Sequence, residues 1–168
     1  MAISMYNASV PIFKNMLNNL SAILTKAQAH AVDNKMDSHA LLQTSLFPDM
    51  LNLTRQVQIS SDFAKGVTAR LAGIELPMYE DNETSFAELQ ARITKTLHFI
   101  SSVEPIKVDG SEDREVITRE GTPKEKRFTG QSYLLEYGIP QFLFHVTTAY
   151  AILRNQGVPI GKRDYMGT

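Results

Sequence analysis

The sequence contains no cysteine, and this absence excludes several kinds of chemistry. Without thiols the chain can form no disulfide bond, no thiolate nucleophile and no cysteine-ligated metal site. Histidine is scarce as well, with four residues in the whole chain. The lack of cysteine fits a reducing compartment, although it does not prove one.

Charge of one sign and long hydrophobic runs are also missing. The formal net charge is −1 and no run of lysine and arginine stands out, so we expect no nucleic-acid binding. The longest uncharged run, Tyr137 to Leu153, contains a glycine, a proline and several polar residues and falls short of a membrane span. No secretory signal is evident at the N-terminus. We expect a cytoplasmic protein that does not associate with membranes.

Length and composition are those of an ordinary globular domain. The chain has 168 residues, of which 43% are apolar and 21% are charged, and these values allow a sizeable core. No internal repeat or low-complexity linker divides the sequence. We therefore expect residues 1–168 to form a single domain.

The clearest helical segment lies in the last third of the sequence. Pro140 suits the first turn of a helix, where its missing N–H removes no bond, and Gly157 suits the left-handed residue just past the end. Val158 would then pack back on Leu153, while Pro159 prevents continuation. The apolar residues between these limits cover most of the helix circumference: Phe142, Leu143, Phe144, Val146, Ala149, Tyr150, Ile152 and Leu153. Such a helix needs neighbours on several sides.

A first helix is predicted near the N-terminus, because apolar residues from Val10 to Ala31 recur at alternating three- and four-residue steps. Its start is left open between Ser9 and a kinked start near Ser4, since Pro11 is tolerated only in a first turn. Residues 33–46 form a connection with a short helical turn.

Two more helices follow the same spacing. The second is expected to open at Pro48 and to end at Gly73. Asp49, Gln56, Phe63 and Arg70 lie at seven-residue intervals along its flank. This row either points polar side chains into the bundle or marks the boundary between core and solvent, and we favour the boundary. The third helix begins at a capping box of Ser85 and Glu88 and runs out near Ser102.

The segment from Ile106 to Gly130 differs from the rest, because it is dense in charge and broken by glycine and proline. Its parts at residues 114–119 and 124–129 flank a Glu-Gly-Thr-Pro turn, which predicts a solvated β-hairpin. Mixed charge signs give neither a phosphate track nor an acidic pocket. Four amphipathic helices with an inserted hairpin predict an all-α four-helix bundle, with the hairpin between helices three and four.

Several stretches carry a family resemblance: residues 47–51 (Phe-Pro-Asp-Met-Leu), residues 70–73 (Arg-Leu-Ala-Gly), residues 144–154 (Phe-His-Val-Thr-Thr-Ala-Tyr-Ala-Ile-Leu-Arg) and residues 161–165 (Gly-Lys-Arg-Asp-Tyr). With these motifs the sequence resembles a domain-of-unknown-function family within the DinB/YfiT-like superfamily, over nearly the whole chain. The resemblance implies an up-down-down-up bundle in which helices two and three run parallel. The crossover from Gly73 to Thr84 is long enough, since it reaches about 40 Å when extended.

The resemblance also implies a metal site in many superfamily members, held by one histidine of the second helix and a His-x-x-x-His pair on the fourth. This sequence departs from that pattern. His145 is followed at i+4 by Ala149 and preceded at i−4 by Gln141, and the second helix has no histidine. Asp49 could replace one imidazole, but one histidine and one aspartate hold zinc or nickel poorly. We expect no metal ion and no other cofactor, with a divalent metal as the alternative.

Three functions remain open. The favoured one is an uncharacterised small-molecule-binding bundle with an incomplete or absent metal site. One alternative is a divalent-metal-dependent transferase or hydrolase of the DinB/YfiT type, and the other is a metal-free structural or dimerisation bundle in which His145 is structural. The candidate ligand pocket consists of His145, Gln56, Asp49, Tyr150 and Gln141. We also expect a homodimer, because three partner helices do not cover a helix that is apolar nearly all round.

Overall fold

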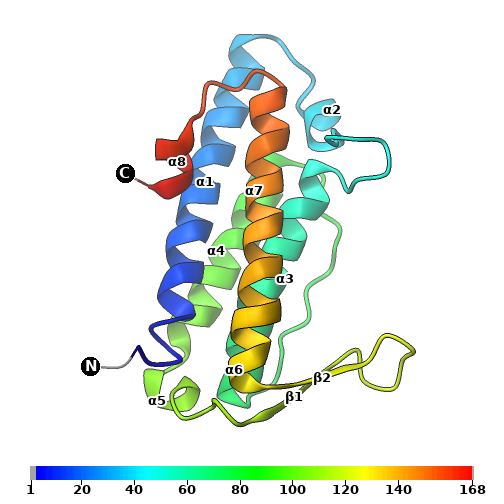
Figure 1. Ribbon diagram of the computed structural model, residues 1–168. Coiled ribbons are helices and arrows are strands. Elements are labelled where there is room, and N and C mark those ends of the chain that lie inside the picture. The colour runs from blue at the N-terminus through cyan, green and yellow to red at the C-terminus, as the bar shows by residue number, and fades with distance from the viewer. Residues whose placement is uncertain (1–2, 168) are drawn as a thin grey trace.

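The computed structural model describes residues 3–167. Its elements in chain order are α1 (Val10–Asp33), α2 (Ser38–Leu42), α3 (Leu53–Ala72), α4 (Phe86–Ser102), α5 (Pro105–Val108), β1 (Glu115–Thr118), β2 (Lys126–Thr129), α6 (Gly130–Ser132), the π-helical turn η1 (Tyr133–Gly138), α7 (Ile139–Asn155) and α8 (Lys162–Met166) (Figure 1).

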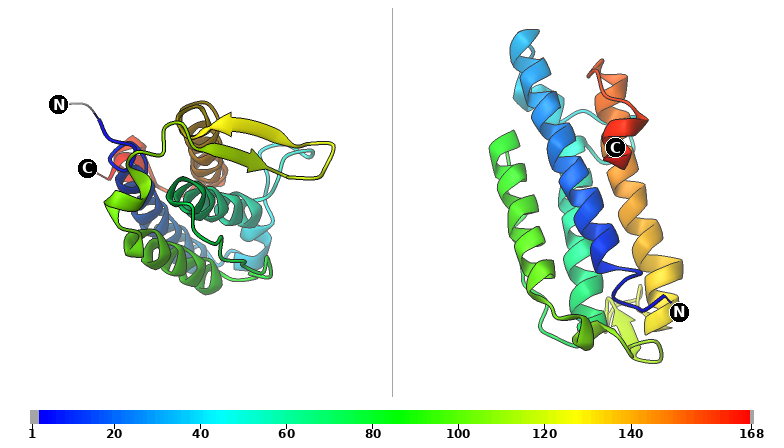
Figure 2. Two further views of the ribbon diagram at one scale, coloured as in Figure 1. Left: turned by 90° about the horizontal axis from the view of Figure 1, so that it is seen from below. Right: turned by 90° about the vertical axis from the view of Figure 1, so that its left-hand side faces the viewer.

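The long helices α1, α3, α4 and α7 lie side by side as a bundle (Figures 1 and 2). α1 and α7 run in one direction, and α3 and α4 run in the other (Figure 1). α3 and α1 each pack against both α4 and α7. The prediction of an all-α, up-down-down-up four-helix bundle is confirmed.

The connection between α3 and α4, residues 74–85, runs along the bundle, because these two helices are parallel (Figure 1). It ends at Ser85, whose hydroxyl accepts a hydrogen bond from the Glu88 N–H at 3.2 Å. The Glu88 carboxylate reaches back to the Thr84 N–H at 2.7 Å. The predicted start of this helix is confirmed, and it follows from cap chemistry at the sequence level.

The predicted start of the second helix at Pro48 is wrong. Pro48 instead lies in a turn that the Met50 N–H closes on the Phe47 carbonyl at 3.0 Å. The helix begins at Leu53, because the side chain of Asn52 caps it by accepting from the Arg55 N–H at 2.9 Å. The fixed φ of proline suits either a helix start or a turn. Its far end, at Gly73 with φ 64°, is as predicted.

The predicted start of the fourth helix is confirmed, because α7 begins at Ile139 with Pro140 in its first turn, but the sequence did not predict the helical backbone that precedes it. Helical backbone runs on from Gly130 through η1 into α7. Pro140 therefore lies inside a longer helical segment, where its missing N–H leaves one carbonyl without its i+4 partner. In η1 the Ile139 N–H bonds to the Leu134 carbonyl, five residues back, so the chain widens by a π turn just before the proline. The end of the helix is as predicted, with Gly157 at φ 86°.

The hairpin is confirmed, with β1 and β2 antiparallel and Val116 opposite Phe128. It continues directly into α6. A Cβ at Gly130 would lie 1.9 Å from the Ser111 carbonyl oxygen, so only glycine allows this close approach at the base of the hairpin. The hairpin thereby extends sideways from the end of the bundle where α3 ends and α7 begins (Figure 1).

The core fills the space between the four long helices, and the edge-to-face pair of Phe13 and Phe142, with ring centroids 4.8 Å apart, joins α1 to α7. α8 packs on α1, where the Asn19 side chain donates to the Tyr165 carbonyl at 3.0 Å. Lys26 and Asp164 add an ion pair at the same contact. Within residues 3–167, no helix has the length and apolar character needed to cross a membrane.

Candidate functional site

His145 of α7 and Gln56 of α3 form a direct hydrogen bond across the bundle. The His145 Nδ1 lies 2.7 Å from the Gln56 Oε1. The amide nitrogen of Gln56 donates to the Leu51 carbonyl at 3.0 Å, so the amide oxygen is the acceptor for the imidazole. This arrangement selects the tautomer with the proton on Nδ1 and leaves a lone pair on Nε2.

The imidazole is surrounded by aromatic rings. Phe63 stacks on it at a centroid distance of 6.0 Å and an angle of 16°, and the Phe144 ring meets it edge-on at 5.2 Å. His145 is only 8% exposed. Burial lowers the pKa of His145 below its ordinary value, and the positive charge of Arg55 lowers it further. The ring is therefore neutral at neutral pH.

These residues do not fit the metal ion that the superfamily implies. The Nδ1–H of His145 donates to the Gln56 amide oxygen, so Nε2 is the ring position left for a metal ion, and the amide of Gln56 supplies no second imidazole. Among residues 3–167 there is no group of three or more histidine, cysteine, aspartate or glutamate side chains that could hold a metal ion. Among these residues, a metal ion at Nε2 would therefore have fewer than three histidine, cysteine, aspartate or glutamate ligands, which is too few for zinc.

Among residues 3–167, no hydrogen bond joins the other three expected pocket residues to this pair. Asp49 is exposed in the turn ahead of α3. The half-buried ring of Tyr150 packs edge-on against Tyr165 of α8 at 5.9 Å. Gln141 is half-buried one helical turn before His145. The structure thus brings together His145 and Gln56, while a ligand role for any of the five residues stays a prediction.

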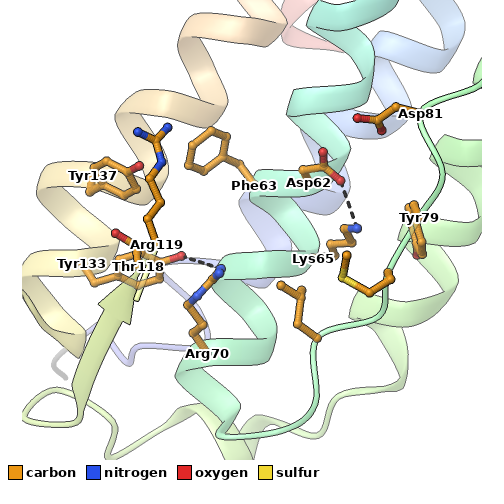
Figure 3. A pocket seen from close by; sticks show the side chains of 12 residues that line it. Asp62, Phe63, Lys65, Arg70, Tyr79, Asp81, Thr118, Arg119, Tyr133 and Tyr137 are labelled. Atoms are coloured by element: carbon orange, nitrogen blue, oxygen red, sulfur yellow. Dashed lines mark hydrogen bonds and ion pairs between the residues drawn. The ribbon is translucent and has the colours of Figure 1, made fainter. Parts of the chain in front are cut away.

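A second site, a cavity of about 360 Å³, lies along the outer face of α3 (Figure 3). Its walls come from α3, from the crossover before α4, from the end of β1 and from η1. The lining residues are Asp62, Phe63, Lys65, Arg70, Leu76, Met78, Tyr79, Asp81, Thr118, Arg119, Tyr133 and Tyr137. Phe63 separates the two sites, because one face of its ring stacks on His145 and the residue also lines the cavity.

The aromatic wall of the cavity is a cluster of rings from three elements. Tyr133 and Tyr137 stack with their centroids 5.9 Å apart, and Phe128 of β2 lies within 5.7 Å of both. Phe63 meets Tyr137 edge-on at 5.8 Å. The Tyr133 hydroxyl accepts a hydrogen bond from Arg70 at 3.2 Å. Burial raises the pKa of Tyr133, so the phenol stays protonated at neutral pH.

The opposite wall is held by the buried guanidinium of Arg92 on α4. Its side chain is 2% exposed and contacts Asp62 at 2.9 Å, Asp81 at 3.0 Å and Glu83 at 2.9 Å. Partial burial alone would raise the pKa of Asp81, but bonds and charges from Arg55 and Arg92 lower it. The crossover is thereby tied to both parallel helices through charge-assisted hydrogen bonds.

Sequence analysis did not find this cavity. The seven-residue row of Gln56, Phe63 and Arg70 was interpreted as a boundary, whereas the structure places Gln56 on the imidazole and the other two in the cavity. Thr118 and Arg119 gave no signal, because nothing in the sequence shows that the end of β1 lies beside α3.

Comparisons with known proteins agree with this fold. A family model described as a domain of unknown function (DUF1993) matches residues 5–166. The chain is also similar to a protein of known structure, a DinB family member from Shewanella denitrificans whose crystal structure has a resolution of 1.83 Å. The two are 39% identical over 97% of this chain and 92% of that one, with a TM-score of 0.91. No curated protein matches the chain.

Proposed function

This chain belongs to the DUF1993 family, and we propose that it binds a small molecule with an apolar body, without a metal ion, in the cavity beside α3. The observation that carries the proposal is the lining of this cavity. Phe63 and Tyr137 line a space of about 360 Å³ with aromatic rings, and Tyr133, which is 1% exposed, stacks on Tyr137 and completes this wall. Small-molecule sites are concave, mostly apolar spaces of roughly 300–1,000 Å³ with a few placed polar groups.

Binding without a metal is supported by the small number of ligands available to His145. Its Nε2 is free to bind, but among residues 3–167 no group of three or more histidine, cysteine, aspartate or glutamate side chains could hold an ion. Purified protein should contain no stoichiometric transition metal after mild chelation, as elemental analysis would measure. Zinc or nickel that survives chelation would contradict this part of the proposal and favour a metal-dependent transferase or hydrolase.

Binding in the cavity can be tested with the neutral probe naphthalene-2-carboxamide, by titration calorimetry. Tyr137→Ala removes a ring from the cavity wall and should weaken binding severalfold. Tyr150→Ala is the matched control, because it removes a half-buried ring of the same helical segment that packs on α8 instead. If neither the carboxamide nor its carboxylic acid binds, or if both variants bind alike, the cavity is not the ligand site.

We also propose that the protein forms a homodimer through the outer face of α7. A shallow apolar groove there is lined by Leu46, Met50, Leu143, Phe144, Thr147, Thr148 and Ala151. Phe144 is 56% exposed, and Phe47 and Leu51 are exposed nearby in the sequence. A second copy would bury these side chains. Sedimentation should give a mass near twice the 18.8 kDa of the chain, and Phe144→Ser should lower it; a single-chain mass at micromolar concentration would refute the dimer.

A further inference from the structure

We propose that the ligand of the α3 cavity is an organic anion, with a carboxylate or phosphate held by Arg70 and Arg119 and an apolar body lying against the tyrosines. This inference rests on the proposed function, since it needs the cavity to be a binding site. It adds the chemical class of the ligand and the two side chains that would select it.

The acidic groups of the cavity are already neutralised. Asp62 is shared by Arg92 at 2.9 Å and Lys65 at 3.0 Å. Asp81 is shared by Arg92 at 3.0 Å and Arg55 at 2.6 Å. Lys65, the cation of this wall that lines the cavity, is occupied as well, because it also donates to the Pro77 carbonyl at 3.0 Å. This side of the cavity has no charge left for a ligand.

The two arginines of the cavity are not neutralised in this way. Within residues 3–167, neither Arg70 nor Arg119 has a carboxylate within ion-pair distance. Arg70 donates one hydrogen bond, to the Tyr133 hydroxyl at 3.2 Å. Lys126 adds a second kind of cation next to Tyr137, with its ammonium 5.6 Å from the centre of that ring. The aromatic side of the cavity therefore carries uncompensated positive charge.

The placement of these groups suits a molecule with two different ends. Arg70 and Arg119 lie on the side of Tyr133, Tyr137 and Phe63, whereas the paired acids lie across the cavity (Figure 3). Arginine recognises carboxylate and phosphate through paired N–H donors, and its plane tolerates adjacent rings. An anion between the arginines would leave its apolar body against the tyrosines.

The end of β1 carries a buried polar group that nothing in the described chain satisfies. Thr118 lines the cavity and is 5% exposed, yet its hydroxyl has no hydrogen-bond partner among residues 3–167. A buried hydroxyl normally has a partner. An anionic oxygen in the cavity would give Thr118 an acceptor and Arg119 a counter-charge.

Three probes with one ring system test this inference: naphthalene-2-carboxylate, naphthalen-2-yl phosphate and the neutral naphthalene-2-carboxamide, titrated calorimetrically at low salt. At least one anion should bind about tenfold or more tightly than the amide, since a charge-assisted hydrogen bond contributes that much. The two anions distinguish a carboxylate ligand from a phosphate ligand.

The variants identify the residues. Arg119→Gln, at an exposed position, should weaken anion binding about tenfold and leave amide binding unchanged, and Arg70→Gln should do the same if its thermal melting shows a folded protein. Arg127→Gln is the matched control, because this hairpin arginine pairs with Glu115 and Glu125 away from the cavity. Equal binding of acid and amide, or an Arg119→Gln variant that binds the anion like the parent, would overturn the inference while leaving the cavity a binding site. If no probe binds, both proposals fail.

Discussion

Replacement of His145 by alanine is expected to lower the free energy of unfolding by about 2–4 kcal/mol. The change leaves the amide oxygen of Gln56, a residue only 1% exposed, without its donor. An unsatisfied buried acceptor costs about 1–3 kcal/mol. The lost imidazole also vacates the space between Phe63 and Phe144, and the resulting cavity adds about 1 kcal/mol, because the ring is small and near the surface.

A double-mutant cycle isolates the hydrogen bond from the packing. Gln56→Leu alone leaves the His145 N–H without an acceptor, whereas Gln56→Leu combined with His145→Leu removes both polar groups. The double variant should therefore cost less than the sum of the single variants, by about 1–3 kcal/mol. An additive result would show that the two side chains do not depend on one another.

Urea unfolding at pH 8, where the imidazole is neutral in both states, measures these differences as shifts in midpoint at constant slope. His98→Ala is the control, because this histidine is exposed on α4 and its loss should change stability by less than about 0.5 kcal/mol. A His145→Ala midpoint that equals or exceeds that of the parent would refute the structural role. It would indicate instead that the imidazole serves a ligand at a cost in stability.

Three further predictions concern stability. The pKa of His145 is lowered in the folded protein, so the unfolded chain binds more protons than the folded one as the pH falls below about 6.5. The free energy of unfolding should therefore decline from about pH 6.5 down to the folded pKa. Urea midpoints measured from about pH 8 to 5 should show this decline, and His145→Gln should flatten it. Gly138→Ala should destabilise by about 1–3 kcal/mol in thermal melting, because the new Cβ would lie 2.6 Å from a Val67 methyl group, whereas Gly161→Ala meets nothing within 4 Å. Arg92→Met should cost about 3 kcal/mol, since it leaves three carboxylates facing one another without their shared cation; a urea midpoint like that of the parent would show that the crossover does not need it.

Much of the fold was predictable because its signals are local. Apolar spacing located the four long helices, the capping box of Ser85 and Glu88 fixed one start, and Gly73 and Gly157 fixed two ends. The resemblance to the DinB/YfiT-like superfamily is confirmed by the family model and the similar crystal structure. The one wrong helix start involves Pro48, whose fixed φ suits a turn as well as a helix start. At Pro140 the helix start was correct, and the π turn ahead of it was not predicted.

The candidate site was less predictable, because its parts are far apart in the chain. The structure brings His145 and Gln56 of the candidate set into contact, since both lie on bundle-facing positions of helices that pack together, and their ligand role stays a prediction. The cavity depends on where two irregular segments come to rest. No local sequence pattern in residues 74–85 or in the hairpin indicates that Tyr79 and Arg119 will line opposite sides of one cavity.

The π turn at Tyr133–Gly138 also sets the angle at which the hairpin leaves the bundle. β2 ends at Thr129 and helical backbone begins at Gly130, so no flexible linker separates the strand from the helix. Deleting one residue from the turn would restore ordinary α geometry and rotate everything ahead of it by about 100° around the helix axis. Arg119 would then swing away from Arg70. The extra residue of the π turn therefore sets the rotation of the hairpin about the helix axis, and with it the position of Arg119 relative to Arg70 on the cavity.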